Sequence, residues 1–145
     1  MATVTLSAMQ SDRVALHRLW WVGPLTISAA VVANVVVRAV AGMAVAIPPE
    51  FAPLHYEHIA LVTAAGVLGA VLTFAGIGRV TRRPIRLFRI VAATVFLLSF
   101  VPDIGLLVSK ALPGANGLTV GVLMVLHVAP ALVSVAILTT LGRDT

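Results

Sequence analysis

Four long apolar stretches, separated by short polar segments, dominate the pattern of residues along the chain. The hydrocarbon layer of a bilayer requires about 20 apolar residues for each helix that crosses it. The stretches at about 20–47, 59–78, 87–112 and 118–141 each meet that requirement. Proline and glycine gather between them, where they interrupt helices. The pattern predicts an all-α integral membrane protein, a four-helix bundle that forms one domain over residues 1–145.

The composition supports a membrane protein and excludes several other classes. Hydrophobic residues make up 60% of the chain, charged residues 10%, and the mean hydropathy is +1.09. A soluble domain is about one quarter charged, so a soluble globular domain, a disordered chain and a coiled coil are all excluded. The chain has no cysteine, which rules out disulfides, thiolate metal sites and a catalytic thiol. The segment before Arg13 is short and polar, so we expect the first span to be a retained helix rather than a signal peptide.

The distribution of Lys and Arg predicts the orientation, because cytoplasmic loops of membrane proteins are enriched in both. The segments outside the first and last spans carry Arg13, Arg18 and Arg143, whereas the first and third connections hold only Lys110. The connection between the second and third spans carries the largest cluster: Arg79, Arg82, Arg83, Arg86 and Arg89. We therefore expect both termini in the cytoplasm and this cluster against anionic lipid head groups. The cluster is short and has one aromatic neighbour, so no nucleic-acid partner is expected.

Polar residues inside the spans are the main candidates for function, because ionisable groups in lipid are costly and usually face protein or water. Counting about 1.5 Å per residue places four of them at similar depth in the outer part of the bundle. These are Asn34, Arg38, Asp103 and His127, with Glu57 and His58 at the outer rim. One interpretation is a polar pocket open to the outside, with Arg38 and Asp103 as its charged pair. The alternative is a structural ion pair that holds the first helix to the third.

Two prolines lie beside these polar residues. Pro102 precedes Asp103, and Pro130 follows His127 by three positions. Proline inside a helix frees the carbonyl four residues earlier, and transporters build binding sites from such freed carbonyls. Proline is also simply commoner in membrane helices than in soluble ones, so both explanations stay open.

No motif for a metal, a cofactor or catalysis is evident. The first connection contains Glu50, His55, Glu57 and His58, but their spacing matches no metal-binding pattern, and a solvated loop explains them equally well. A haem would need axial ligands on facing helices, and His58 and His127 differ in depth. We therefore expect no metal, no cofactor and no catalytic residues, although the sequence leaves enzymatic activity open.

Small residues recur every four positions on several spans. Ala65, Gly69 and Thr73 form one line, and Gly117 and Gly121 begin another. Such lines let helix backbones approach closely in lipid. They predict either internal packing, self-association or contact with another membrane subunit.

Four segments carry a resemblance to a known family: LWWVGPL at 19–25, RPIRLFRIV at 83–91, LLSFVPD at 97–103 and MVLHV at 124–128. In these segments the chain resembles a family of small four-span bacterial membrane proteins that is catalogued only as a domain of unknown function. The resemblance implies four helices and a bacterial inner (plasma) membrane. It implies no activity and assigns no catalytic residue.

Three functional hypotheses follow. The first is a small non-enzymatic membrane protein that forms an oligomer or serves as an accessory subunit of a larger complex. The second is a small transporter or proton-coupled carrier that uses Arg38, Asp103 and His127. The third is a membrane-embedded enzyme acting on a lipid or quinone, with Asp103 and His127 as acid and base.

Overall fold

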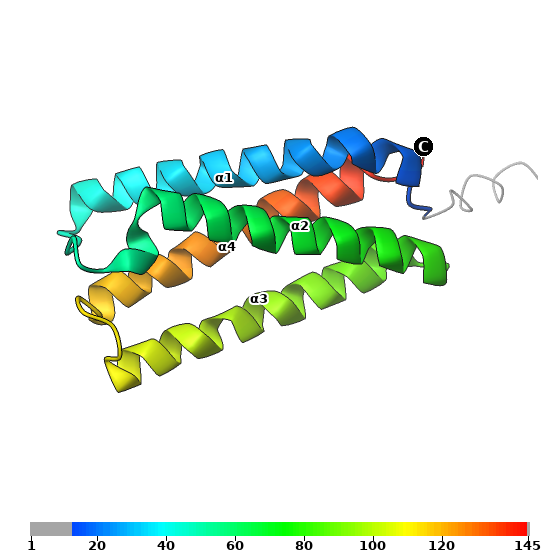
Figure 1. The fold of residues 1–145 in the computed structure, drawn as a ribbon. Coiled ribbons are helices and arrows are strands. Elements are labelled where there is room, and N and C mark those ends of the chain that lie inside the picture. The colour runs from blue at the N-terminus through cyan, green and yellow to red at the C-terminus, as the bar shows by residue number, and fades with distance from the viewer. Residues whose placement is uncertain (1–12, 145) are drawn as a thin grey trace, which may run out of the picture.

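Four long helices joined by short connections make up the structure, a computed structural model that describes residues 13–144 (Figure 1). The long helices are α1 (Leu19–Ala44), α2 (Tyr56–Val80), α3 (Pro84–Ser109) and α4 (Gly117–Leu141). Two short 3-10 helices precede α1 and α2, namely η2 (Leu16–Arg18) and η3 (Ala52–Leu54). The predicted all-α four-helix fold is confirmed. Residues 1–12 and 145, which the predicted single domain also includes, lie outside the described residues.

All four helices are long and apolar enough to cross a membrane. A helix of 26 residues, such as α1 or α3, is about 39 Å long at 1.5 Å per residue, more than the hydrocarbon layer requires. Both α2 and α3 begin three residues earlier than the sequence pattern predicted. Pro84 suits the first position of α3, because its missing N–H has no partner there in any helix. Glu57 and Arg86 then lie in exposed first turns, where charged side chains are tolerated.

Local chemistry determines where α3 ends and where α4 begins. Lys110 ends α3 in the left-handed conformation, with φ of 51°, and Gly114 takes a positive φ of 76° in the turn that follows. Asn116 then caps α4, because its side chain accepts hydrogen bonds from the backbone N–H groups of Leu118 and Thr119. The Thr119 hydroxyl accepts in return from the backbone N–H of Asn116, which completes a capping box.

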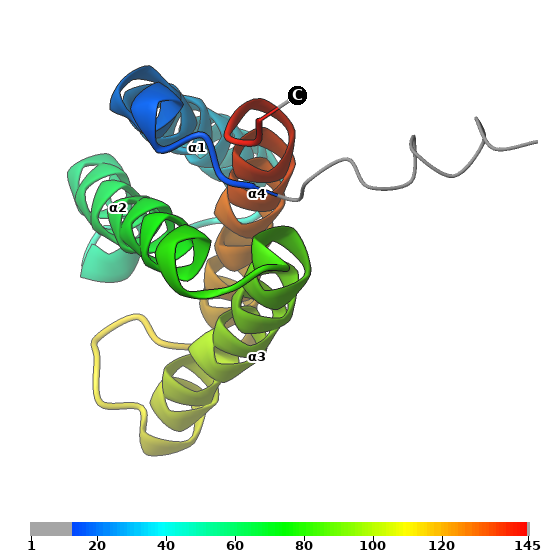
Figure 2. The same ribbon diagram turned by 90° about the vertical axis from the view of Figure 1, so that its right-hand side faces the viewer.

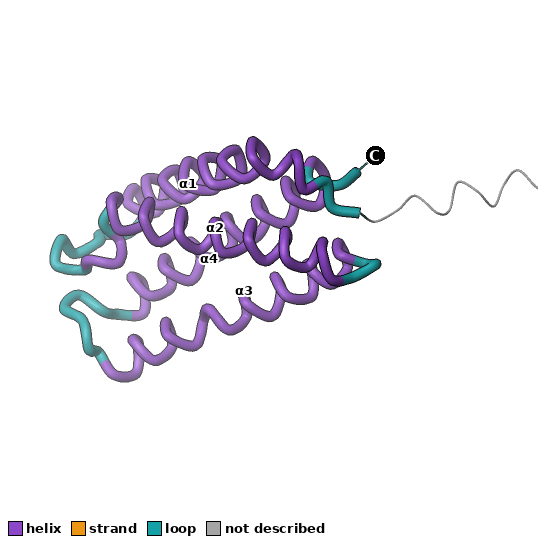
Figure 3. The backbone as a smooth tube through the Cα atoms, turned by 45° about the vertical axis from the view of Figure 1, so that its right-hand side comes forward, coloured by secondary structure: helices purple, strands orange, loops and turns teal. Residues whose placement is uncertain are grey.

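The helices pack unevenly. α1 lies along both α2 and α4, whereas α3 packs mainly on α4, and α3 diverges from α2 toward one end of the bundle (Figures 1 and 2). Both termini of the described chain and the turn at 81–83 lie at one end, which we call the basic end. The connections at 45–55 and 110–116 lie at the other, which we call the opposite end (Figure 3).

A hydrophobic cluster closes the basic end. Phe74 of α2 meets Phe88 of α3 edge to face, with ring centroids 4.9 Å apart, and Leu138 of α4 is fully buried against them. The terminal segments fasten this end. The N–H of Ala15 donates to the carbonyl of Gly142 at 2.8 Å, and that of Asp144 donates to the carbonyl of Arg13 at 2.9 Å.

A second cluster closes the opposite end. It joins Phe51 and Leu54, from the connection before α2, to Ile59 of α2 and Leu126 of α4. Phe51 and Leu54 are fully buried, so this connection is a packed part of the fold rather than a solvated loop.

Gly78 offers a test of the packing at the basic end. A Cβ atom at Gly78 would lie 2.6 Å from the Cβ of Val14, closer than real contacts allow, whereas a Cβ at Gly105 of α3 would meet nothing within 4 Å. We expect Gly78→Ala to destabilise the protein by about 1–3 kcal/mol through overpacking. The matched control Gly105→Ala should stabilise the protein slightly, by up to about 1 kcal/mol, because alanine favours helix more than glycine does. Thermal unfolding in detergent measures both, and equal midpoints for the two variants would contradict this account of the terminal packing.

Candidate functional site

A groove of about 660 Å³ runs between α2, α3 and α4 and reaches Asn34 of α1 at its floor. This volume is within the range of ligand-binding pockets, which is about 300–1,000 Å³. Most of the lining is apolar. The polar side chains in it are Asn34, His58, Thr63, Thr73, Ser99, Asp103, His127 and Ser134.

The groove follows the bundle axis. On α2 its lining extends from His58, near the opposite end, to Thr73, a distance of about 22 Å at 1.5 Å per residue. Phe88 of α3 lines it toward the basic end, where the contact with Phe74 holds α2 and α3 together. The groove is therefore long and narrow, and aromatic packing closes it at the basic end.

The groove opens sideways between α2 and α3. Val62 of α2 and Val95 of α3, which both line it, are 54% and 59% exposed. Gly66 and Gly69 line the same wall of α2, and a Cβ atom at either would meet nothing within 4 Å. Small residues that elsewhere allow close helix packing here leave open space, because no helix of the described chain fills it. In a membrane this opening would face the acyl chains.

Asn34 is anchored at the floor by a hydrogen bond between helices. Its Nδ2 donates to the hydroxyl of Thr63 on α2 at 2.8 Å, and both residues are buried. The amide oxygen of Asn34 has no hydrogen-bond partner among the described residues. The anchored amide therefore leaves a buried acceptor at the groove floor.

Asp103 and His127 form the ionisable part of the floor. Asp103 is 4% exposed, and its Oδ2 lies 3.4 Å from Nδ1 of His127. That imidazole nitrogen lies closer, at 2.8 Å, to the carbonyl of Leu123, which can only accept, so Nδ1 carries the hydrogen. In a neutral ring Nε2 then has the free lone pair. Asp103 Oδ2, like the amide oxygen of Asn34, accepts no hydrogen bond from the described residues.

Two other hydroxyl groups in the lining are engaged within their own helices. Ser99 donates to the carbonyl of Phe96 at 2.6 Å, and Thr73 donates to that of Gly69 at 2.8 Å. These groups do not compete for the floor. The two buried polar atoms without a partner, the amide oxygen of Asn34 and Oδ2 of Asp103, are both acceptors that would receive hydrogen bonds from a molecule that donates.

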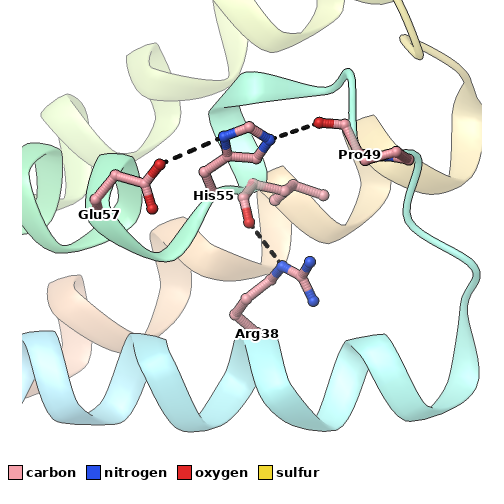
Figure 4. A network of polar contacts seen from close by, with 5 residues as sticks. Arg38, Pro49, His55 and Glu57 are labelled. Carbon is pink, nitrogen blue, oxygen red and sulfur yellow. Dashed lines mark hydrogen bonds and ion pairs between the residues drawn. The ribbon is translucent and has the colours of Figure 1, made fainter.

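The expected pairing of Arg38 with Asp103 is wrong. Arg38 does not line the groove; its Nε donates to the carbonyl of Leu54 at 2.8 Å, and its guanidinium carbon lies 5.1 Å from the centre of the Tyr56 ring. Figure 4 shows the side chain reaching toward the segment before α2. Gly42, one turn further along α1, leaves room for it, since a Cβ there would lie 2.7 Å from Nη1. Arg38 thus holds α1 to the start of α2, and His127 takes the place expected for it beside Asp103.

The two predicted rim residues, Glu57 and His58, have different surroundings. Glu57 lies 3.5 Å from Nδ1 of His55, whose Nε2 is 2.7 Å from the carbonyl of Pro49, as Figure 4 shows. His58 is exposed and lines the groove near the opposite end of the bundle. Among residues 13–144 no three His, Asp or Glu side chains are grouped to hold a metal ion.

The arginine cluster lies at the basic end. Arg79, Arg82, Arg83, Arg86 and Arg89 are all exposed, at the end of α2, in the turn and in the first turns of α3. Arg18 lies at the same end, where its Nη1 donates a hydrogen bond to the carbonyl of Arg143 at 3.4 Å. The described chain thus gathers arginine at this end, and the opposite end carries Lys110 with Glu50 and Glu57.

Sequence analysis found three of the floor residues and missed Thr63. A signal for it was present, because Thr63, Gly66, Ala70 and Thr73 recur at helical spacing and share one face of α2. A threonine on a face of small residues could have been read as the hydrogen-bonding partner of a polar residue on a neighbouring helix.

Comparison with known proteins identifies a family but no function. No curated protein and no solved structure matches the chain. A family model described as a family of unknown function, DUF6069, matches residues 14–144, a range that includes all four helices. The chain therefore belongs to the DUF6069 family of unknown function.

Proposed function

We propose that this small membrane protein binds an amphiphile, a molecule with a long apolar part and a polar head, that enters from the bilayer between α2 and α3. The observation that carries the proposal is the groove itself: a space of about 660 Å³ with apolar walls and buried, unsatisfied acceptors at its floor. A ligand pocket combines these same features, an apolar lining with few polar groups that orient the ligand.

The position of the polar floor supports a head-and-tail ligand. Asp103 lies six residues before the end of α3, about 9 Å from the opposite end of the bundle. The apolar walls continue from there toward Phe88 at the basic end. A head group at Asp103 and His127 would thus lie nearer a membrane surface, and its tail would extend into the bilayer interior.

Binding is common to the carrier and the lipid-enzyme hypotheses. Both begin with an amphiphile in the groove, and Asp103 and His127, 3.4 Å apart, form the acid-base pair that either would use. Neither needs Arg38, which is engaged elsewhere. We favour binding without chemistry, because the hydroxyl of Ser99, one turn from Asp103, is committed to the carbonyl of Phe96.

The arginine distribution supports an orientation with the basic end in the cytoplasm. Positive residues in short connections favour retention on that side. The basic end would then meet the anionic head groups of the inner leaflet of a bacterial plasma membrane. The groove floor would lie in the outer half of the bilayer.

A second candidate function, assembly with a second copy or another subunit, is favoured by a different face. Ala41 of α1 and Gly117 and Gly121 of α4 line a shallow apolar hollow of about 270 Å³. A Cβ atom at either glycine would meet nothing within 4 Å. Helices in lipid associate through such small-residue faces.

Filling the groove tests the amphiphile proposal. We expect the double variant with Gly66→Leu and Gly69→Leu to fold, because each new side chain enters open space and leucine favours helix. It should lose the amphiphile that co-purifies with the wild-type protein in mild detergent, as detected by mass spectrometry of solvent extracts. Gly105→Leu, also in open space but outside the groove, is the control and should keep it. The same extract from all three proteins would refute binding in the groove.

Cysteine labelling tests the orientation, and the cysteine-free chain makes single reporters possible without prior changes. Thr81→Cys lies in the turn at the basic end and Ala111→Cys in the connection at the opposite end. A membrane-impermeant maleimide added to intact cells should label Ala111→Cys and reach Thr81→Cys only after permeabilisation. The reverse pattern would invert the proposed orientation.

Leucine at the second face tests assembly. If copies or subunits meet there, Gly117→Leu with Gly121→Leu should shift the protein to a smaller species in light scattering after size-exclusion chromatography. The double variant at Gly66 and Gly69 serves as the comparison, since it alters a different face. An unchanged mass for the Gly117 and Gly121 variant would remove this face as an assembly site.

A further inference from the structure

The groove contains one carboxyl group, that of Asp103, and no basic Lys or Arg side chain of the described chain. The other titratable groups that face it are His127 of α4 and His58, which is exposed at the rim of α2. Asn34 of α1 and Thr63 of α2 do not titrate. A cation for the carboxylate must therefore come from His127 or from a ligand.

The two unpartnered buried atoms at the floor also share one hydrogen-bonding character. The free oxygen of Asn34 and Oδ2 of Asp103 both accept, and both residues are at least nine-tenths buried. With Nδ1 of His127 committed to the carbonyl of Leu123, the neutral imidazole also presents an acceptor. A buried acceptor without a donor is unfavourable, and an uncompensated charge is more so.

Resting on the proposed amphiphile binding, we propose that the ligand is a lipophilic amine whose protonated head binds at Asp103 while its alkyl chain follows the walls of α2 and α3. A protonated amine supplies both missing elements, because it carries a positive charge and donates up to three hydrogen bonds. An alcohol of the same length donates but leaves the carboxylate charge unbalanced. A quaternary ammonium balances the charge but donates nothing.

His127 makes this binding sensitive to pH. When its imidazole is protonated, the ring balances the Asp103 carboxylate across 3.4 Å and competes with the amine. A proton on Asp103 removes the charge that attracts the head. Both events occur as the solution becomes more acidic, so amine binding weakens as pH falls. His58 lies at the exposed rim, where solvent screens it.

Three probes of equal chain length separate charge from hydrogen bonding: dodecylamine, dodecyltrimethylammonium and 1-dodecanol. Native mass spectrometry of the full-length protein in a non-ionic detergent measures the binding of each. We expect the amine to bind about tenfold or more tighter than either of the others, as for a charge-assisted hydrogen bond in a buried site. Asp103→Asn, of nearly equal size, should reduce amine binding to the level of the alcohol and leave the alcohol unchanged.

The outcomes distinguish this inference from the proposal on which it rests. If the amine and the alcohol bind equally, and leucine at Gly66 and Gly69 abolishes both, the groove binds amphiphiles but the amine preference is wrong. If no probe binds the wild-type protein, or the leucine variant binds all three unchanged, amphiphile binding in the groove itself is wrong. The comparison of probes on wild-type protein does not depend on whether any Asp103 variant folds.

A variant of His127 tests the competition separately. His127→Gln removes the imidazole cation and keeps a polar side chain. We expect its affinity for dodecylamine to fall less than that of wild type between pH 8 and pH 5.5, because no imidazole cation then competes for Asp103. An identical pH dependence in the two proteins would show that His127 does not compete for Asp103.

Discussion

The edge-to-face contact between Phe74 and Phe88 holds α2 to α3 at the basic end, and the groove depends on it. Away from these two rings, toward the opposite end, α3 diverges from α2 (Figures 1 and 2). Further along, the facing positions include Gly66 and Gly69 on α2 and Ala92 on α3, which are too small to fill that separation. An aromatic contact at one end followed by small residues produces an open wall, whereas small residues throughout would have let the helices close on each other.

The bundle remains stable around this opening because its two ends are packed independently. Phe74, Phe88 and Leu138 close the basic end, and Phe51 and Leu54 fill the opposite end from the connection before α2. The middle of the bundle is held by α1 and α4, joined to α2 partly through the hydrogen bond from Asn34 to Thr63. The groove thus occupies the one region where the fold does not need apolar packing between α2 and α3.

Much of this could be predicted from the sequence, because hydrophobic length identifies a membrane helix almost without regard to its neighbours. The depth of a residue in the membrane also follows from counting residues along its helix, and this predicted similar depths for Asn34, Asp103 and His127. Counting does not say which helices are adjacent or where a long side chain turns. The predicted partner of Arg38 was wrong for this reason. Helix α1 packs on α2 and α4, and the guanidinium of Arg38 reaches the carbonyl of Leu54. The packed connection at Phe51 escaped prediction too, since a short proline-rich segment has no periodicity that indicates burial.

The energetics of Asp103 favour the proposed binding role over a purely structural one. A buried ionic pair is costly to desolvate, and apolar residues of similar size often stabilise a fold as well or better. The contact between Asp103 and His127 is long, at 3.4 Å, and its imidazole hydrogen points to a backbone carbonyl instead. A pair selected for stability would have its hydrogen bonds satisfied within the chain, as Asn116 and Thr119 do at the start of α4. Oδ2 of Asp103 is instead left without a hydrogen-bond partner among the described residues, and in the proposed binding mode a ligand head group would supply one.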